Sequence, residues 1–341
     1  MNDVTQAYLQ GWRDKALAFE RRLNDVVLGL APAVRLLTIS IFARGHVLLE
    51  GDVGVGKTTL LRAAARGIGG AYQRVEGTID LMPHDMIYHT HVDRDGRPRV
   101  DPGPLLAHGA NLSVFFFNEI NRARPQVHSL LLRVMAERSV TAFNAEHHFP
   151  HLQVFADRNR VEKEETFELP GAARDRFLME IEIDPADDES VHRQLMFEER
   201  FHDTDSLINR IEEGQLDYRE LGSVARMIQS SVQAGAAVQE YASHLRRATH
   251  RPAQAGIRLD GVDMDELILA GAGPRGMSML VRAAKVAAWL DGRLHLTPED
   301  LRAVFHQVIG HRVFFTPIYE LQRSELAPEF SAAILRGVPA P

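Results

Sequence analysis

The stretch GDVGVGKTT, residues 51–59, constrains the fold of this chain more than any other part of its sequence. It fits the pattern G-x-x-x-x-G-K-[ST] through Gly51, Gly56, Lys57 and Thr58. An apolar, strand-like stretch precedes it and a helix-like stretch follows, which is the context in which this pattern binds phosphates. Glycines let backbone N–H groups close around phosphate oxygens, and the helix N-terminus adds partial positive charge. We therefore predict that the chain binds a nucleoside triphosphate.

The predicted phosphate loop supplies both the nucleotide contacts and one magnesium ligand. Lys57 is placed to reach the β- and γ-phosphates of ATP, and the Thr58 hydroxyl is placed to ligate Mg²⁺. The expected nucleotide-binding residues of the loop are Gly51, Asp52, Val53, Gly54, Val55, Gly56, Lys57, Thr58 and Thr59. The expected cofactors are therefore ATP or ADP and Mg²⁺.

Strand-like and helix-like stretches alternate along the first half of the chain. The strand-like stretches are 46–51, 72–77, 113–118, 152–157 and 177–183, and two helices precede the first of them within 1–44. Such alternation predicts an α/β fold with a parallel sheet covered by helices on both faces. Hairpins are expected around Asp95-Gly96, within 89–104, and around Asn144.

From residue 186 the pattern is helical almost to the end, and the acidic segment DPADDES (184–190) is the expected boundary. We accordingly predict a nucleotide-binding core over 1–185, a helical domain over 186–320 and a C-terminal tail over 321–341. The tail has short amphipathic pieces, so it is expected either to contact a partner or to brace the helical domain.

The bulk composition excludes several classes of protein. The 341 residues are 45% hydrophobic and 25% charged, as in an ordinary globular protein of about two domains. No run approaches the ~18 apolar residues of a membrane span, and the amphipathic start is unlike a secretory signal. Because the chain has no cysteine, disulfides are excluded and a cytoplasmic location is expected. The net charge of −7 argues against broad binding of nucleic acid.

A second motif follows the strand-like residues 113–118, where the chain reads SVFFFNEINRARPQ. A buried strand that ends in acidic residues delivers them to a nucleotide site, and such strands usually end in Asp-Glu. Here the first of the two positions is Asn118 and the second is Glu119.

Several blocks in order resemble the MoxR branch of the AAA+ ATPases, over about residues 25–315. They are the phosphate loop, GPLL before the acidic strand, NEINRARPQVHSLLLRVMAER, NRVEKEETFELPGAARDRF (159–177) and AGAGPRGMSMLVRAAKVAAWLDGRLHLTPED (270–300). The resemblance implies an αβα core with a five-stranded parallel sheet, a small all-helical lid domain and assembly into a homo-oligomeric ring, usually a hexamer. It also implies that the two hairpins contact the client, although each could instead be a polar surface hairpin.

The resemblance implies a role for each of four polar residues. Glu119 matches the catalytic glutamate that polarises the attacking water, and Asn159 matches the sensor-1 residue that orients this water or touches the γ-phosphate. Arg176 matches the arginine finger that reaches a neighbouring subunit's nucleotide, and such a finger raises the rate by about 10³–10⁵. Arg275, in GAGPRG, matches the sensor-2 arginine of the lid.

Three of these four roles have a plainer alternative. Glu119 could be an ordinary acid at a helix start, Asn159 a turn-forming residue and Arg275 part of a helix-starting loop. Arg174 stands where the family usually has leucine, and it could be a second finger or a surface charge. The family usually reads Ala-Thr-Gln-Asn-Pro around sensor 1, whereas this chain reads ADRNR and so places Asp157 and Arg158 beside the site.

Asn118 departs from the aspartate that the family usually has before its glutamate. An amide oxygen can accept a hydrogen bond from a magnesium-bound water, but it attracts the ion less than a carboxylate does. We therefore expect weaker Mg²⁺ affinity and slow turnover, with nucleotide binding retained.

Three functions are consistent with these residues. The first is an ATP-driven remodeller that matures a client, works with a von Willebrand A domain partner and helps to insert a metal or cofactor. Resemblance to the methanol-oxidation subgroup makes methanol dehydrogenase a candidate client. The second is a nucleotide-gated scaffold with little hydrolysis, which Asn118 favours and Glu119 opposes. The third, a DNA-remodelling motor, has the right fold but lacks a basic arm or a helix-turn-helix.

Overall fold

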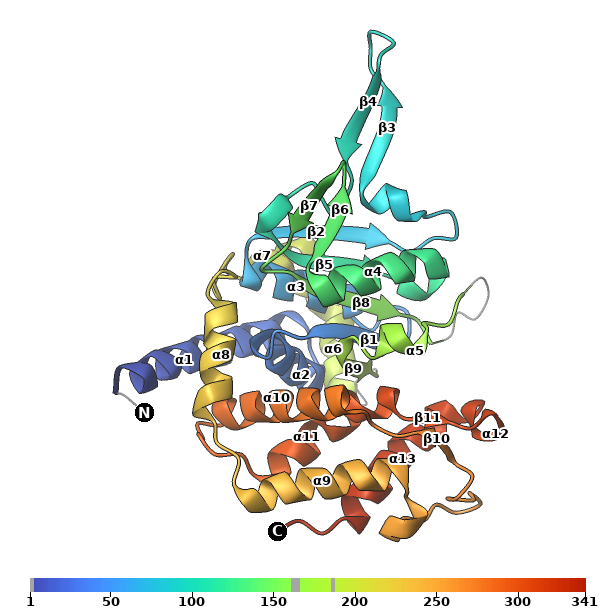
Figure 1. Cartoon of the computed structure of the whole chain (residues 1–341). Helices are drawn as coiled ribbons and strands as arrows, with labels where there is room; N and C mark the ends of the chain where they lie inside the picture. The colour runs from blue at the N-terminus through green and yellow to red at the C-terminus, as the bar shows by residue number, and fades with distance from the viewer. Residues whose placement is uncertain (1–2, 161–165, 185–187) are drawn as a thin grey trace. The chain divides into compact units, whose positions relative to one another are not determined.

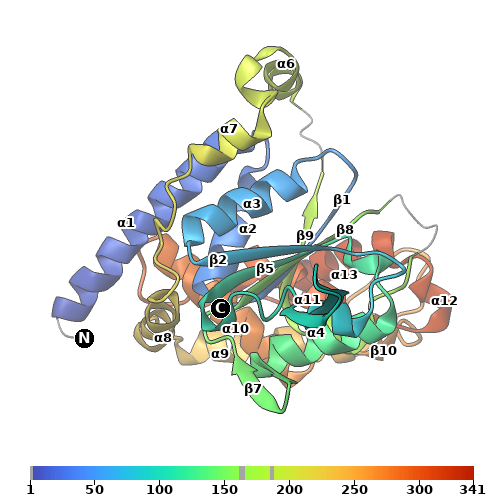
Figure 2. The same ribbon diagram turned by 90° about the horizontal axis from the view of Figure 1, so that it is seen from above.

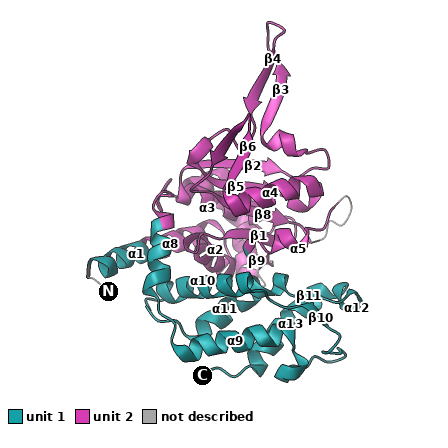
Figure 3. Ribbon diagram, viewed as in Figure 1, with its two compact units in different colours: residues 1–14, 178–180, 223–341 teal, residues 15–177, 181–222 magenta. Residues whose placement is uncertain are grey.

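The computed structural model describes residues 3–160, 166–184 and 188–341. The chain divides into two compact units, which Figure 3 distinguishes by colour. Unit 2 comprises residues 15–177 and 181–222, and unit 1 comprises residues 1–14, 178–180 and 223–341. Among the described residues, no helix is long and apolar enough to cross a membrane.

A five-stranded sheet forms the centre of the nucleotide-binding fold, with the strand order β2-β5-β8-β1-β9 (Figure 1). The strands are β1 (His46–Gly51), β2 (Ala71–Glu76), β5 (Leu112–Asn118), β8 (Gln153–Arg158) and β9 (Phe177–Ile183). Neighbours β2 and β5, β5 and β8, and β8 and β1 all pair in parallel. The predicted strands and the parallel α/β fold class are thus confirmed.

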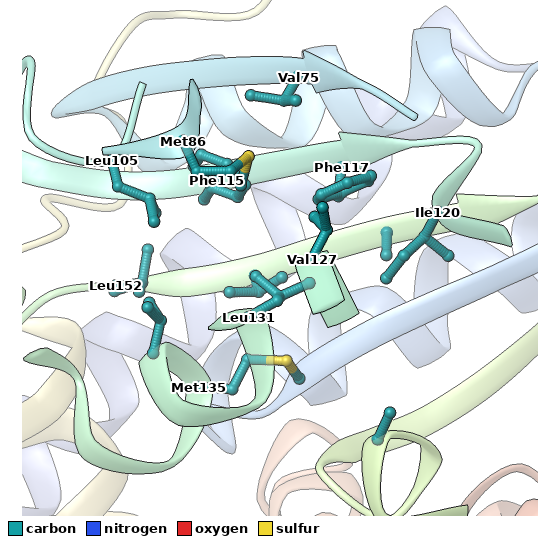
Figure 4. Packing of buried hydrophobic residues seen from close by; sticks show 14 of the residues in the cluster. Val75, Met86, Leu105, Phe115, Phe117, Ile120, Val127, Leu131, Met135 and Leu152 are labelled. Carbon is teal, nitrogen blue, oxygen red and sulfur yellow. The ribbon is translucent and has the colours of Figure 1, made fainter. Parts of the chain in front are cut away.

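Helices cover both faces of this sheet, as Figure 2 shows for α3 (Lys57–Ile68) and α4 (Pro125–Glu137). Strand β5 explains why both faces need cover, because all seven of its residues are buried. Alternate residues of a strand point to opposite faces. Phe115 and Phe117 pack in one apolar cluster with Val127 and Leu131 of α4 (Figure 4), which places Phe116 on the opposite face.

Two more helices of this part of the chain match the sequence prediction for 1–44. They are α1 (Asp3–Val26), which contributes to both units, and α2 (Ala31–Phe42). Pro32 stands in the first turn of α2, where its missing N–H costs no hydrogen bond. The short helix α5 (Gly171–Arg174) precedes β9.

Both predicted hairpins are present in unit 2. Strands β3 (Tyr88–Val92) and β4 (Pro98–Pro102) pair antiparallel around a turn that contains Gly96 at φ 76°. Strands β6 (Ser139–Ala142) and β7 (Ala145–His148) pair around Phe143 and Asn144. The latter two residues have φ of 52° and 59°, and two consecutive positive φ values are typical of a type I′ turn.

From residue 223 on, unit 1 is helical apart from one two-stranded ribbon that the sequence pattern does not indicate. The ribbon joins β10 (Ile268–Ala270) to β11 (Phe314–Phe315) in antiparallel pairing. The helices after residue 220 are α8 (Leu221–Ser231), α9 (Ala236–His250), α10 (Pro274–Leu290), α11 (Pro298–Ile309), α12 (Pro317–Glu320) and α13 (Arg323–Gly337).

The compact units differ in extent from the domain ranges expected from the sequence. The expected boundary between residues 185 and 186 lies outside the described residues. Helices α6 (Glu189–Phe197) and α7 (Thr204–Asn209) belong to unit 2, where Arg62 of α3 donates to Asp205 of α7 at 2.7 Å. The expected tail contains α13, whose residues Phe330 and Ile334 are buried in unit 1. This packing favours the bracing role for the tail.

Candidate active site

The carboxyl ends of three parallel strands bring the predicted site residues to one edge of the sheet. Strand β1 ends at Gly51 and leads into the phosphate loop, β5 ends at Asn118, and β8 ends at Arg158. Asn159 follows β8 directly, as Glu119 follows β5. Ligands of open α/β sheets bind outside the carboxyl ends of the strands, so this edge is the candidate active site.

The phosphate loop has the backbone geometry that its glycines allow. Gly54 and Gly56 have φ of 83° and 91°, a region that side-chain-bearing residues rarely adopt. Gly51 is required for a different reason, because a Cβ atom there would lie 2.3 Å from the carbonyl oxygen of Ile183. Helix α3 then begins at Lys57 and points its N-terminus at the loop.

Lys57 is buried, with 6% of its surface exposed, and its ammonium group faces the loop. The Nζ atom donates to the carbonyl oxygens of Gly51 at 2.5 Å and Asp52 at 2.8 Å, and to Oδ1 of Asn159 at 2.7 Å. Burial lowers the pKa of Lys57, and the negative charges of Asp157, Asp52 and Glu119 oppose this shift. The cation is thus held at the mouth of the loop, where phosphates would bind.

Asn159 joins the lysine to the predicted catalytic glutamate. Its Oδ1 accepts from Lys57, and its Nδ2 donates to Oε1 of Glu119 at 3.3 Å. The second carboxylate oxygen of Glu119 accepts from Arg122 Nη1 at 3.0 Å. One continuous chain of hydrogen bonds therefore connects three residues that stand far apart in the sequence.

Glu119 also has an unusual backbone conformation, with φ 52° and ψ 51°. Its N–H donates to Oδ1 of Asp157 at 2.7 Å, and Asp157 is only 2% exposed. Burial raises the pKa of Asp157 to about 6, against the opposing effects of this hydrogen bond and of Lys57. The two charges that the sequence places beside the site differ in role, since Arg158 pairs with Glu50 at 2.6 Å.

Asn118 lies between Thr58 and a carboxylate that the sequence pattern does not single out. The Thr58 hydroxyl is 3.4 Å from Oδ1 of Asn118. The Nδ2 atom of Asn118 donates to Oε1 of Glu76, which is its direct partner in the β2–β5 register. Because a carboxylate at neutral pH can only accept, Glu76 fixes which way the amide faces. The amide oxygen therefore points to Thr58.

The donor atoms at this position suit a magnesium ion. Hydroxyl and amide oxygens are hard donors, and Mg²⁺ takes most of its remaining ligands from water and nucleotide phosphates. Within the described ranges, no group of three or more His, Cys, Asp or Glu residues could hold a metal ion alone. The residues therefore fit an ion that arrives with the nucleotide.

The three arginines with predicted roles lie outside this hydrogen-bond chain. Arg174 ends α5, and Arg176 follows two residues later, its N–H bonded to the carbonyl of Ala173. Both side chains are half-buried. Arg275 is the second residue of α10 in unit 1, next to Pro274. Their roles toward the nucleotide stay predictions.

Three residues of the site have contacts that the sequence alone does not predict: Glu76, Arg122 and Asp157. Only one of these contacts has a local sequence signal: Glu119 and Arg122 stand three residues apart, a spacing that indicates an ion pair. The contact between Glu76 and Asn118 depends on the register of two strands that stand 42 positions apart, which the sequence alone does not give.

Comparisons with known proteins agree with this geometry. The model of the AAA family of ATPases associated with various cellular activities matches residues 46–179, and that of an AAA lid domain matches residues 263–333. The chain is 61% identical over 335 residues to Protein MoxR of Methylorubrum extorquens, covering 98% of each chain. It is 54% identical over 333 residues to Protein MoxR of Paracoccus denitrificans, again covering 98% of each.

Two more distant proteins extend the comparison. Chaperone MoxR1 of Mycobacterium tuberculosis is 32% identical over 313 residues, which are 90% of this chain and 77% of the relative. The crystal structure of a candidate ATPase from Cytophaga hutchinsonii superposes with a TM-score of 0.81 at 27% identity, and the match covers 99% of this chain and 98% of that one.

Proposed function

The chain belongs to the MoxR family of AAA+ ATPases, and from this premise we propose that it couples ATP binding and slow Mg²⁺-dependent hydrolysis to the remodelling or maturation of a client protein complex. Its enzymatic class, an ATPase, follows from the family itself. The rate, the metal and the client are the proposed parts.

The hydrogen-bond chain from Lys57 through Asn159 to Glu119 is the observation that supports hydrolysis. In this proposal Lys57 binds the β- and γ-phosphates, Asn159 positions the attacking water, and Glu119 polarises it for in-line attack. Phosphoryl transfer depends almost entirely on such positioning and on charge stabilisation. A phosphate entering the loop would replace the carbonyl and amide oxygens that now accept hydrogen bonds from Lys57. Asn159 would then be free of its hydrogen bond to Lys57.

The metal is assigned to Thr58 directly and to Asn118 through a water molecule. Bound Mg²⁺ supplies charge that offsets the phosphate oxygens in the transition state. Thr58 and Asn118 orient this ion from the protein side, and the neutral amide of Asn118 accounts for the slow turnover that we propose.

ATPase rates measured against Mg²⁺ concentration for the wild type and Glu119→Gln test the hydrolysis assignment. We expect Glu119→Gln to bind a fluorescent ATP analogue normally and to lose at least about tenfold in rate, as removal of a water-positioning group does. If Glu119→Gln matched the wild type at saturating Mg²⁺, Glu119 would not be the water activator.

The proposed assembly is a homo-oligomeric ring, with a hexamer as the expected form, in which Arg176 reaches the nucleotide of the next subunit. Arg275 of the lid would contact the phosphates of the nucleotide bound by its own chain. Mixing Lys57→Ala and Arg176→Ala proteins tests the shared site, because mixed rings place an intact Lys57 opposite an intact Arg176. Activity of the mixture no higher than that of either variant alone would contradict it.

The partners in this proposal follow from the family resemblance: a von Willebrand A domain protein and a client, for which methanol dehydrogenase is the candidate. The relative named Chaperone MoxR1 supports a chaperone-like activity. Co-purification of the tagged Glu119→Gln variant with ATP, which should retain the client, tests this part.

A nucleotide-gated scaffold is the second candidate, and Asn118 is the observation that favours it. If the protein is a scaffold, Glu119→Gln and the wild type should support client maturation equally. If it is an ATP-driven remodeller, only the wild type should support client maturation.

A further inference from the structure

A basic cavity of about 650 Å³ lies within unit 1, at the C-terminal half of α9. Its charged and titratable lining consists of His244, Arg246, Arg247, His250 and Arg251. The described residues that line it include no Asp or Glu. The rest of its wall is amide and aliphatic and includes the C-terminal residues 337–339. We call these five side chains the α9 basic cluster.

The three arginines of the α9 basic cluster have exposed side chains, and they form no ion pair with any residue in the described ranges. Two other arginines of unit 1 do form ion pairs, Arg293 with Asp300 at 2.6 Å and Arg323 with Glu320 at 3.1 Å. The chain has a net charge of −7, so these three cations gather against the general trend.

Local structure explains only part of the cluster. Cations in the last turn of α9 interact favourably with the helix dipole, which accounts for Arg247 and His250. The Nε2 atom of His250 bonds to the carbonyl of Ala272 at 2.9 Å, and His244 lies 3.8 Å from Glu240 on the preceding turn. These contacts leave Arg246 and Arg251 without a structural reason to face the same cavity.

The chemistry of the cluster selects an anionic ligand. A guanidinium presents a planar fork of donors that matches carboxylate or phosphate in bidentate geometry. The aliphatic part of the wall, at Val338 and Pro339, suits a ligand that also carries apolar groups. Nucleic acid fits less well, because its backbone requires an extended basic stripe and the chain as a whole is acidic.

We propose that the α9 basic cluster binds an acidic peptide segment of a protein partner, whose carboxylates pair with Arg246, Arg247 and Arg251 while aliphatic side chains contact Val338 and Pro339. The site uses residues of unit 1 only and requires neither hydrolysis nor the catalytic roles proposed above. A failure of one proposal is therefore distinguishable from a failure of the other.

Fluorescence anisotropy with the full chain tests the proposal. The probe is a short fluorescein-labelled peptide of Asp, Glu and Leu, and the matched probe has Asn and Gln in place of the acids. The site variant is Arg247→Gln/Arg251→Gln. The control variant is Arg210→Gln/Arg226→Gln, which removes the same charge from exposed arginines outside the cavity.

We expect the wild type to bind the acidic probe, more weakly at higher salt, and not the amide probe. The site variant should bind it about tenfold more weakly or worse, since each charge-assisted hydrogen bond contributes more than a neutral one. The control variant should change affinity by less than about twofold. Both variants should bind a fluorescent ATP analogue like the wild type, which verifies that they are folded.

Several outcomes would overturn the proposal. Equal weakening in the control variant would mean that only overall charge matters, and binding of the amide probe would remove the role of carboxylates. Tighter binding of a single-stranded oligonucleotide through the same arginines would reassign the site to nucleic acid. Full displacement of the peptide by inorganic phosphate at low millimolar concentration would make it a small-anion site.

Discussion

Restoring the aspartate that the family usually has at position 118 is expected to help this protein only if Glu76 is neutralised as well. In the present site the amide of Asn118 donates to the Glu76 carboxylate. Asn118→Asp replaces that donor with a second carboxylate and so converts an attractive contact into a repulsive one. The decisive set is therefore Asn118→Asp, Glu76→Gln and the double variant.

The size of the effect follows from the position of Glu76. Two unit charges about 4 Å apart interact by about 1 kcal/mol in water and about 4 kcal/mol near a protein surface. The Glu76 side chain is 50% exposed and also pairs with Arg74 at 2.9 Å, so screening places the repulsion near the lower limit. We expect a coupling of about 1–2 kcal/mol, a factor of about 5–30 in an equilibrium constant.

Two measurements read out this coupling without relying on turnover. Urea unfolding of the nucleotide-free proteins should show that Asn118→Asp destabilises the chain, and that the same change in the Glu76→Gln background costs less. Binding of a fluorescent ATP analogue should also be titrated against Mg²⁺. The apparent Mg²⁺ affinity should rise more in the double variant than in Asn118→Asp alone. Additive effects to within about 0.5 kcal/mol in both assays would refute the reasoning.

Three further perturbations have expected outcomes. The pKa of Asp157 is raised to about 6, so stability is lost as the pH rises from about 4 to about 6, and the loss is complete above that value. Urea unfolding should therefore find Asp157→Asn more stable than the wild type by about 1–3 kcal/mol at pH 7, and the difference should vanish below about pH 4. Arg293→Ala should lower the free energy of unfolding by about 1–3 kcal/mol, because the buried Asp300 loses two short hydrogen bonds. An unchanged melting temperature would contradict this expectation. Gly51→Ala should weaken binding of the ATP analogue and lower the melting temperature, because its methyl group would collide with the Ile183 carbonyl.

The sequence predicts the sheet and its nucleotide edge well, because both depend on local patterns. Strand β5 is a continuous apolar run bounded by polar residues, and the phosphate loop fixes which strand precedes which helix. Parallel pairing then brings Glu119 and Asn159 to the same edge, so their meeting near Lys57 follows from topology alone.

Contacts that depend on register or on long-range packing are not accessible in the same way. The partner of Asn118 is set by which residue of β2 stands opposite it. The assignment of α6 and α7 to unit 2 rests on contacts such as that between Arg62 and Asp205, which no periodicity indicates. The ribbon of β10 and β11 is only three and two residues long, too short to produce an alternating pattern.

The carboxylates around the site explain why an amide, and not a carboxylate, stands at position 118. Burial is the main cause of the raised pKa of Asp157, and the negative charges of Glu119 and Glu76 add to it. Lys57 offsets part of it. A further aspartate at 118 would stand directly beside Glu76 in the register and add to this repulsion. A neutral amide that donates to Glu76 and turns its oxygen to Thr58 keeps an acceptor on the metal side without another charge. In this chain the exchange of aspartate for asparagine is thus coupled to Glu76, and these two positions have to be altered together to restore the usual site.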